Sequence, residues 1–221
     1  MRPAVALIVA KSPVEGRVKT RLGRELGMEH AADLAAAALL DTVGACATAY
    51  GAARCHLALD GVLAHGRIAD ELLDATAEWT SHPQRGADFA ERLVNAHEDA
   101  AAASGAPVVQ VGMDTPHLKA RTLIEVAARL THPDDAVLGP AYDGGWWLLG
   151  VGGPHLLSHL RQVPMSTGDT GTLTREALIR AGARVTDVEM LRDVDEVADA
   201  ESVAATAPGT RFARAFSWTA R

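Results

Sequence analysis

The chain has 221 residues, 48% of them hydrophobic, which is enough for one α/β domain with a single core, and we expect one domain over residues 1–221. Its formal net charge of −7 argues against a general nucleic-acid-binding protein, which would carry a basic surface. With only two cysteines, no signal-peptide pattern and no run of about 18 apolar residues, the sequence predicts a cytoplasmic protein with free thiols and no membrane span.

Apolar segments of strand length alternate along the chain with longer helical segments. Strands are predicted at 4–10, 54–59, 78–80, 107–112, 136–138, 146–151 and 184–188. Helices are predicted at 25–49, 64–75, 87–103, 119–130, 170–181 and 196–204. This alternation is typical of a mostly parallel sheet with helices on both faces. Ligands of such sheets bind beyond the carboxyl ends of the strands.

The loop after the first predicted strand is strongly basic. Within residues 11–21 it holds Lys11, Arg17, Lys19 and Arg21, and these include two of the three lysines in the chain. A strand that ends in a basic loop and then enters a helix offers backbone N–H groups and cationic side chains to an anion. We interpret this loop as a phosphate-binding segment, and the alternative is a solvated loop.

Three aspartates follow predicted strands and are candidate metal ligands. Asp114 lies where an apolar strand leaves the sheet, while Asp193 and Asp195 follow the last strand and point to one side if that segment is extended. Carboxylates near a phosphate site favour Mg²⁺ or Mn²⁺, because these ions prefer oxygen ligands. The alternative is helix capping, since Asp195 immediately precedes a predicted helix.

The segment Asp143-Gly144-Gly145 predicts a tight turn that a ligand can approach closely, and the alternative is a plain β-hairpin. In the strand that follows, Trp146 and Trp147 point to opposite faces of the sheet, so at most one of them lines a pocket.

The segment 166–170 (Ser-Thr-Gly-Asp-Thr) is a polar loop that enters a helix. Helix capping is the favoured role of Asp169, and contact with an acceptor is the favoured role of Ser166. Just before the helix predicted at 87–103, Gln84 is a candidate for reading the edge of a nucleobase through its side-chain amide.

Five strings in the same order along the chain resemble a bacterial group of glycosyltransferase-like proteins related to 2-phospho-L-lactate guanylyltransferase. The strings are residues 10–22, 112–116, 139–145, 166–170 and 193–195. The group is part of the GT-A or nucleotide-diphospho-sugar transferase superfamily, and the resemblance extends from residue 4 to about residue 204. It implies a Rossmann-like, three-layer α/β/α sandwich and a divalent metal ion, Mg²⁺ or Mn²⁺.

The resemblance also implies roles for individual residues. The basic side chains that would contact the donor phosphates, and act in catalysis with Asp114, are Lys11, Arg17, Lys19 and Arg21. The rest of the nucleotide site would be Gly16, Gln84, Gly86, Asp88 and Met113. The acceptor would border Asp143, Gly144, Gly145, Trp146, Ser166 and Gly168. The metal ligands would be Asp114, Asp193 and Asp195. The first loop departs from the pyrophosphorylases of the superfamily, because it has only Gly16 where they carry several glycines.

The leading hypothesis is a metal-dependent nucleotidyltransferase, in which a small phosphorylated or carboxylated acceptor attacks the α-phosphate of a nucleoside triphosphate and releases pyrophosphate. The alternatives are a glycosyltransferase that uses a nucleotide-sugar and a nucleotide-binding protein without catalysis. The expected partners are therefore a nucleotide and a small-molecule acceptor, with no nucleic acid. Base preference, acceptor identity and a homodimer are left open.

Overall fold

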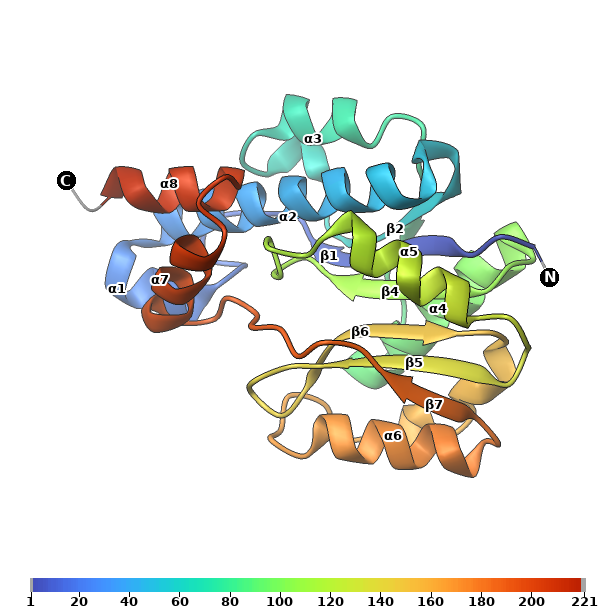
Figure 1. Cartoon of the computed structure of the whole chain (residues 1–221). Coiled ribbons are helices and arrows are strands. Elements are labelled where there is room, and N and C mark those ends of the chain that lie inside the picture. Colours follow the sequence, from blue (N-terminus) through green and yellow to red (C-terminus); the bar gives the residue numbers. More distant parts are fainter. Residues whose placement is uncertain (1, 220–221) are drawn as a thin grey trace.

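The computed structural model of the protein describes residues 2–219 and contains one seven-stranded sheet (Figure 1). The strands are β1 (Val5–Lys11), β2 (Cys55–Asp60), β3 (Thr80–Pro83), β4 (Val108–Gly112), β5 (Asp135–Pro140), β6 (Trp146–Val151) and β7 (Arg184–Asp187). Their order across the sheet is β3-β2-β1-β4-β6-β5-β7. Strand β6 is antiparallel to both of its neighbours, and the other neighbouring pairs are parallel. The predicted mostly parallel sheet is confirmed, with one reversed strand, β6, which forms with β5 the β-hairpin given as the alternative for residues 143–145.

Eight α-helices connect and flank these strands within the described residues. They are α1 (Thr20–Leu26), α2 (Met28–Tyr50), α3 (Ala69–Ala75), α4 (Phe89–Ser104), α5 (Ala120–Arg129), α6 (Thr170–Arg180), α7 (Val197–Thr206) and α8 (Arg211–Thr219). Four short 3-10 helices are η1 (Ala52–Arg54), η2 (Leu63–His65), η3 (Pro154–Leu157) and η4 (Leu160–Gln162).

Helices cover both faces of the sheet because its central strands are apolar on both sides. In β1, Ile8 packs in one cluster with residues of α2 and α5, whereas Leu7 packs in another with residues of α4. On the α4 face, α6 covers β5 and β6, with Leu178 packed in the same cluster as Leu138 and Leu149. The predicted three-layer α/β/α sandwich is therefore confirmed.

Helix α2 is long and apolar enough, by length and composition alone, to cross a membrane, with a mean hydropathy of 1.3 in its most apolar window. In the fold it is a core helix, because 67% of that window is buried against other elements. Its cysteine, Cys46, is buried and free, as is Cys55 at the start of β2, so the predicted free thiols are confirmed.

Sequence reasoning missed helices α1 and α8. Gly27, with a φ of 91°, separates α1 from α2, so the single helix predicted from residue 25 was wrong at its start. Helix α8 is fixed by a distant carboxylate, since the backbone N–H groups of Arg211 and Phe212 donate to Asp41 of α2 at 3.0 and 2.9 Å. Phe212 is also buried between these helices.

Candidate active site

A cleft of about 630 Å³ lies where β1 and β4 end. It brings together the basic loop, the three aspartates and the two polar loops, which are far apart in the sequence. The predicted site residues that line it are Lys11, Arg17, Lys19, Arg21, Gln84, Met113, Asp114, Asp143, Gly145, Trp146, Ser166, Gly168, Asp193 and Asp195. Four other predicted residues do not line it: Gly16, Gly86, Asp88 and Gly144.

The three aspartates converge because two backbone segments meet. Asp114 follows β4, and Asp193 and Asp195 lie in the segment that connects β7 to α7 (Figure 1). The backbone N–H of Val194 donates to the carbonyl oxygen of Asp114 at 3.0 Å, which holds Asp193 and Asp195 beside that residue. One carboxylate oxygen from each aspartate lies within 4.8 Å of the other two. This all-oxygen donor set fits Mg²⁺ or Mn²⁺.

The alternative role of Asp195 as a helix cap is wrong. The N-cap of α7 is Glu196, which forms a capping box with Asp199. The carboxylate of Asp199 also accepts from the backbone N–H groups of Asp195 and Glu196 at 3.3 and 3.0 Å. These bonds order the start of α7 and leave the carboxylate of Asp195 directed to the cleft.

Lys19 lies between two of the aspartates. Its Nζ is 2.8 Å from Asp114 Oδ2 and 2.8 Å from Asp195 Oδ1, and its side chain is only 10% exposed. Burial alone would lower the pKa of Lys19, but the two carboxylates outweigh burial and raise it above its ordinary value. Its backbone is left-handed, with a φ of 45°, a conformation that costs a non-glycine residue about 1–2 kcal/mol. The surrounding structure therefore holds this ammonium in place against local strain.

The carboxyl groups of Asp193 and Asp195 have opposite pKa shifts. Burial, together with the nearby charges of Asp114, Asp143 and Asp195, raises the pKa of Asp193 to about 7. Burial also acts to raise the pKa of Asp195, but the charge and hydrogen bond of Lys19 overcome it and lower that pKa. Asp193 is thus the member of the triad with no cationic partner among the described residues, and a bound divalent cation would favour its ionised form.

The cations of the loop are free to meet a ligand. Lys11, Arg17 and Arg21 are exposed, and within residues 2–219 their side chains form no hydrogen bond or ion pair. The loop turns at Gly16, whose φ is 71°. The charge of Arg21 also acts on Asp195 and helps to lower the pKa of that carboxyl group. Three exposed cations beside three carboxylates are an arrangement suited to a metal-bound phosphate ligand.

The turn at 143–145 and the loop at 166–168 form one wall of the cleft. The Oδ1 of Asp143 accepts from the backbone N–H of Gly145 at 2.8 Å, which closes the predicted tight turn. A Cβ at Gly144 would lie 2.0 Å from the carbonyl oxygen of Gly168, so only glycine permits this contact. The backbone N–H of Gly171 donates to the carbonyl oxygen of Gly144 at 2.8 Å and ties the turn to α6.

The two tryptophans divide as the strand periodicity predicts. Trp146 lines the cleft, whereas Trp147 is 3% exposed and donates from Nε1 to the carbonyl oxygen of Glu189 at 3.0 Å.

The predicted capping of α6 by the side chain of Asp169 is wrong, because that side chain forms no cap hydrogen bond. The hydroxyl of Thr170 instead accepts from the backbone N–H of Thr167 at 3.1 Å.

Two of the predicted nucleoside contacts, Gln84 and Asp88, already hold parts of the fold together. Gln84 lines the cleft, but its Nε2 donates to the carbonyl oxygens of Ala10 and Ala58, so this amide nitrogen is already used to join the ends of β1 and β2. Asp88 is the N-cap of α4 and accepts from the backbone N–H of Glu91 at 2.8 Å. Its carboxylate therefore has a structural role at the start of the helix.

A second cavity of about 270 Å³ adjoins the cleft and shares Lys11 and Arg17 with it. Its other lining residues lie at the end of β2 or in the loops after β1 and β2, and they include Ser12, Asp60 and His65. Sequence reasoning missed this cavity. Among the lining residues of the main cleft that were not predicted are Phe89, Leu93, Gln110 and Met165. Of these, only Gln110 carried a signal, as a polar residue within an apolar strand.

Comparison with known families identifies the chain. The sequence profile of DUF2064, described as "Uncharacterized protein conserved in bacteria", matches residues 42–167. The chain belongs to this family. The part of the chain that matches DUF2064 contains Asp114, Asp143 and Ser166, whereas the basic loop and the segment with Asp193 lie outside it. No curated protein sequence matches the chain.

Solved structures show the same fold. A proposed nucleotide-diphospho-sugar transferase from Desulfovibrio desulfuricans G20 has 27% sequence identity and a TM-score of 0.77, covering 97% of this chain and 91% of its own. A CMP:2-keto-3-deoxy-manno-octonic acid synthetase complexed with CTP has 15% identity and a TM-score of 0.56, with 94% and 99% covered. A cytidylyltransferase from Leptospira borgpetersenii has 11% identity and a TM-score of 0.57, with 98% and 93% covered. This DUF2064 protein therefore has the nucleotide-diphospho-sugar transferase fold.

Proposed function

We propose that this DUF2064 protein is a metal-dependent nucleotidyltransferase, which transfers a nucleotidyl group from a nucleoside triphosphate to a small phosphorylated or carboxylated acceptor. The observation that carries the proposal is the convergence of Asp114, Asp193 and Asp195 beside Lys19 and a loop of unpaired cations. Structural relatives support the general kind of function, since they include a cytidylyltransferase and a synthetase solved with CTP.

The donor would lie across the ends of β1 and β4. Lys11, Arg17 and Arg21 would bind its phosphates, because they are the exposed cations of the cleft without partners among the described residues. Its nucleoside would extend toward Gln84 and the second cavity, since both lie at the ends of β1 and β2 and that cavity shares Lys11 and Arg17 with the cleft.

The reaction requires little covalent chemistry from the protein. An acceptor oxygen would attack the α-phosphorus, the bond from that phosphorus to the oxygen bridging the α- and β-phosphates would break, and pyrophosphate would leave with the electron pair. A divalent cation on the three aspartates would supply charge neutralisation at the phosphates. The basic side chains would hold the triphosphate in line with the acceptor, and a single electrostatic contact of this kind contributes about 10²–10³ in rate.

A glycosyltransferase that uses a nucleotide-sugar is the second candidate. It is favoured by the proposed nucleotide-diphospho-sugar transferase with 27% identity over 97% of this chain. The leaving group separates the two candidates, because nucleotidyl transfer releases pyrophosphate and glycosyl transfer releases a nucleoside diphosphate.

The test begins with melting temperatures measured for each common nucleoside triphosphate and nucleotide-sugar, with and without Mg²⁺. A ligand that binds only the folded state raises the melting temperature, and we expect a shift with a nucleoside triphosphate that depends on Mg²⁺. Products are then assayed with a panel of phosphorylated and carboxylated acceptors. The proposal fails if no nucleotide shifts the melting temperature. Binding without product, with affinity unchanged in Asp114→Ala, would instead indicate a nucleotide-binding protein without catalysis.

A further inference from the structure

One wall of the cleft is apolar and has no evident role in holding phosphate or metal. It is formed by Phe89 and Leu93 of α4, Trp146 of β6 and Met165 of the loop before α6. Leu93 is 2% exposed, whereas Phe89 is 45% exposed and offers much of its ring to the solvent. Large exposed side chains of this kind, beside a site, are typical of surfaces that bind the apolar part of a ligand.

A buried amide lies within this apolar wall. Gln110 is in β4, where it pairs with Leu7 of β1 and Leu149 of β6, and its side chain lines the cleft although it is only 2% exposed. Its Oε1 is buried and has no hydrogen-bond partner among residues 2–219. A buried polar atom without a partner destabilises a fold, and nearly all such atoms in proteins are paired. A ligand that supplies a hydrogen bond would satisfy Gln110.

The wall is held in position before any ligand binds. The Nε1 of Trp146 donates to the hydroxyl of Thr174 in α6 at 3.1 Å, which fixes the indole ring and occupies its N–H group. Trp146 and Met165 pack against both apolar clusters on this face of the sheet. A rigid aromatic surface binds a ligand at a low entropic cost.

The apolar wall itself offers few free hydrogen-bonding groups, whereas the adjoining loop at 166–168 offers the hydroxyl of Ser166, which has no hydrogen-bond partner among residues 2–219. The hydroxyl of Thr170, which also lines the cleft, donates to the carbonyl oxygen of Pro164 at 2.9 Å and accepts from the backbone N–H of Thr167. At the apolar wall, the hydroxyl groups of a sugar would lose hydrogen bonds with water and gain few new partners. The wall therefore favours a ligand with an apolar ring over one covered with hydroxyl groups.

We propose that this wall is the acceptor subsite, and that the acceptor carries an apolar ring with an amide-like edge that pairs with the side chain of Gln110. The inference rests on the proposed function, since it names the chemical class of the acceptor. A nucleobase has similar chemistry, but Gln84 and the second cavity lie at the ends of β1 and β2, whereas Gln110 and Trp146 lie on β4 and β6. The donor base and the acceptor therefore have separate places.

The test uses three probes: benzamide, which has the ring and the amide, toluene, which has only the ring, and glucose 6-phosphate, which is rich in hydroxyl groups. Binding is followed by NMR through the indole N–H signal of Trp146, assigned with Trp146→Phe. We expect benzamide and toluene to shift this signal and glucose 6-phosphate to leave it unchanged. Gln110→Leu should weaken benzamide binding about tenfold, since it removes one hydrogen bond, and should change toluene binding less than twofold.

A second variant tests the proposal independently in case Gln110→Leu does not fold. Phe89 is half exposed, so Phe89→Ala leaves the core intact, and it should weaken both benzamide and toluene about threefold or more. The same titrations are repeated with Mg²⁺ and a saturating nucleoside triphosphate, where benzamide should still bind. Three results would overturn the proposal: benzamide leaves the Trp146 signal unchanged, neither variant weakens benzamide binding, or the nucleotide displaces benzamide.

Failure of the subsite and failure of the proposed function are distinguishable. Asp193→Asn should reduce nucleotide binding with Mg²⁺ while leaving benzamide binding unchanged, because Asp193 belongs to the triad and not to the apolar wall. Nucleotide binding without benzamide binding would overturn only the subsite. Benzamide binding without any nucleotide binding would overturn the proposed transferase and, with it, the assignment of this wall to an acceptor.

Discussion

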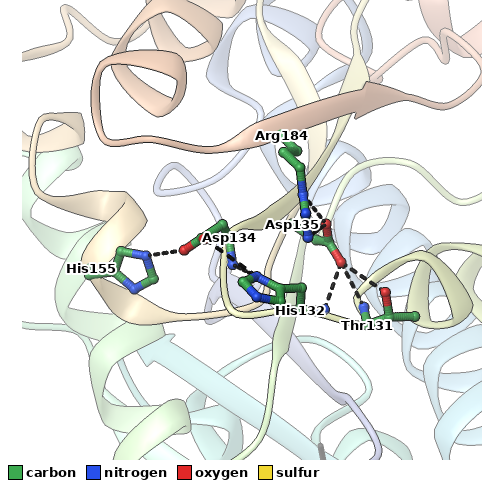
Figure 2. A network of polar contacts seen from close by, with 6 residues as sticks. All are labelled: Thr131, His132, Asp134, Asp135, His155 and Arg184. Carbon is green, nitrogen blue, oxygen red and sulfur yellow. Dashed lines mark hydrogen bonds and ion pairs between the residues drawn. The ribbon is translucent and has the colours of Figure 1, made fainter.

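Two clusters of charged residues lie at opposite ends of the same sheet. The active-site cluster, at the carboxyl end of β4, consists of Lys19, Asp114, Asp193 and Asp195. The edge network lies where β5 and β7 begin, and Figure 2 shows its members: Thr131, His132, Asp134, Asp135, His155 and Arg184. Both clusters combine carboxylates with basic side chains.

The two clusters differ in the number of hydrogen bonds and ion pairs that their carboxylates form. Asp135 accepts from two backbone N–H groups, from the hydroxyl of Thr131 and twice from the guanidinium of Arg184. Burial acts to raise the pKa of Asp135, but these bonds outweigh it and lower that pKa. Asp193 shows the reverse, with a pKa raised to about 7 and no ion pair among the described residues. A carboxylate whose oxygens accept several hydrogen bonds, like that of Asp135, indicates a structural role. A buried carboxylate that lies among other carboxylates and has no ion pair, like that of Asp193, indicates a ligand site.

The largest expected effect is on catalysis at the active-site cluster. Asp114→Asn removes one of three carboxylates and one partner of Lys19, so we expect the rate of pyrophosphate release to fall about 10²–10³-fold. The matched control is Asp134→Asn in the edge network, which should keep the rate within about twofold. An equal fall in the rate of pyrophosphate release in the two variants would show that the two clusters do not differ in function.

The next effect is on stability and its response to Mg²⁺. Lys19→Met leaves two carboxylates without their cation, and we expect it to lower the free energy of unfolding by about 2–3 kcal/mol without metal. Mg²⁺ should raise the melting temperature of this variant more than that of the wild type, because the ammonium no longer competes for the same oxygens. Lys19→Gly should be about 1 kcal/mol more stable than Lys19→Met, since glycine relieves the left-handed backbone. An equal Mg²⁺ response in wild type and variants would contradict the assigned metal ligands.

The fold could be predicted from the sequence wherever local pattern and burial agree. Strand β1 is an apolar run up to Lys11, strand β4 is apolar except for Gln110, and helices α4 and α5 keep helical spacing, so the three-layer architecture follows from them. Helix α8 could not be predicted, because what fixes it is the carboxylate of Asp41, about 170 residues away in the chain. The reversed direction of β6 depends on the tight turn at 143–145, which the sequence indicated without deciding between a hairpin and a ligand loop.

The sequence predicted the charged part of the candidate site but, apart from Trp146, not its apolar part. Motif position placed Lys19 near Asp114, since each follows a strand that ends at the same edge of the sheet. Leu93 and Met165 look like ordinary core residues in the sequence, and only tertiary packing brings them to the cleft. Gly86 was predicted at the nucleotide but does not line the cleft. It lies against the start of α4, where a Cβ would be 2.8 Å from the backbone nitrogen of Arg92.

Within the edge network, Asp135 should affect stability and leave activity unchanged. Asp135→Asn removes a charge that accepts five hydrogen bonds, and we expect a loss of about 2 kcal/mol, or roughly 4–8 °C in melting temperature. Because the pKa of Asp135 is lowered in the folded state, its contribution is present above the unfolded value of about 3.9 and is lost as the pH falls further. The difference in melting temperature between wild type and variant should therefore shrink below about pH 4. A loss of pyrophosphate release at constant stability would show that the edge network is coupled to the cleft.

The smallest effect is expected at the outer end of the same network. His155 Nε2 lies 3.0 Å from Asp134 Oδ1, but the two side chains are 50% and 44% exposed, and solvent screens such a pair. His155→Ala should change the free energy of unfolding by less than about 0.5 kcal/mol, measured by urea denaturation. A double-mutant cycle with Asp134→Ala isolates the pair, and a coupling above about 1 kcal/mol would show that the network acts as one unit extending from Asp135 to His155. A coupling energy near zero would mean that the pair of His155 and Asp134 adds nothing to stability. The stabilising contacts of the edge network would then be those of Asp135 and Arg184, which join β5 to β7.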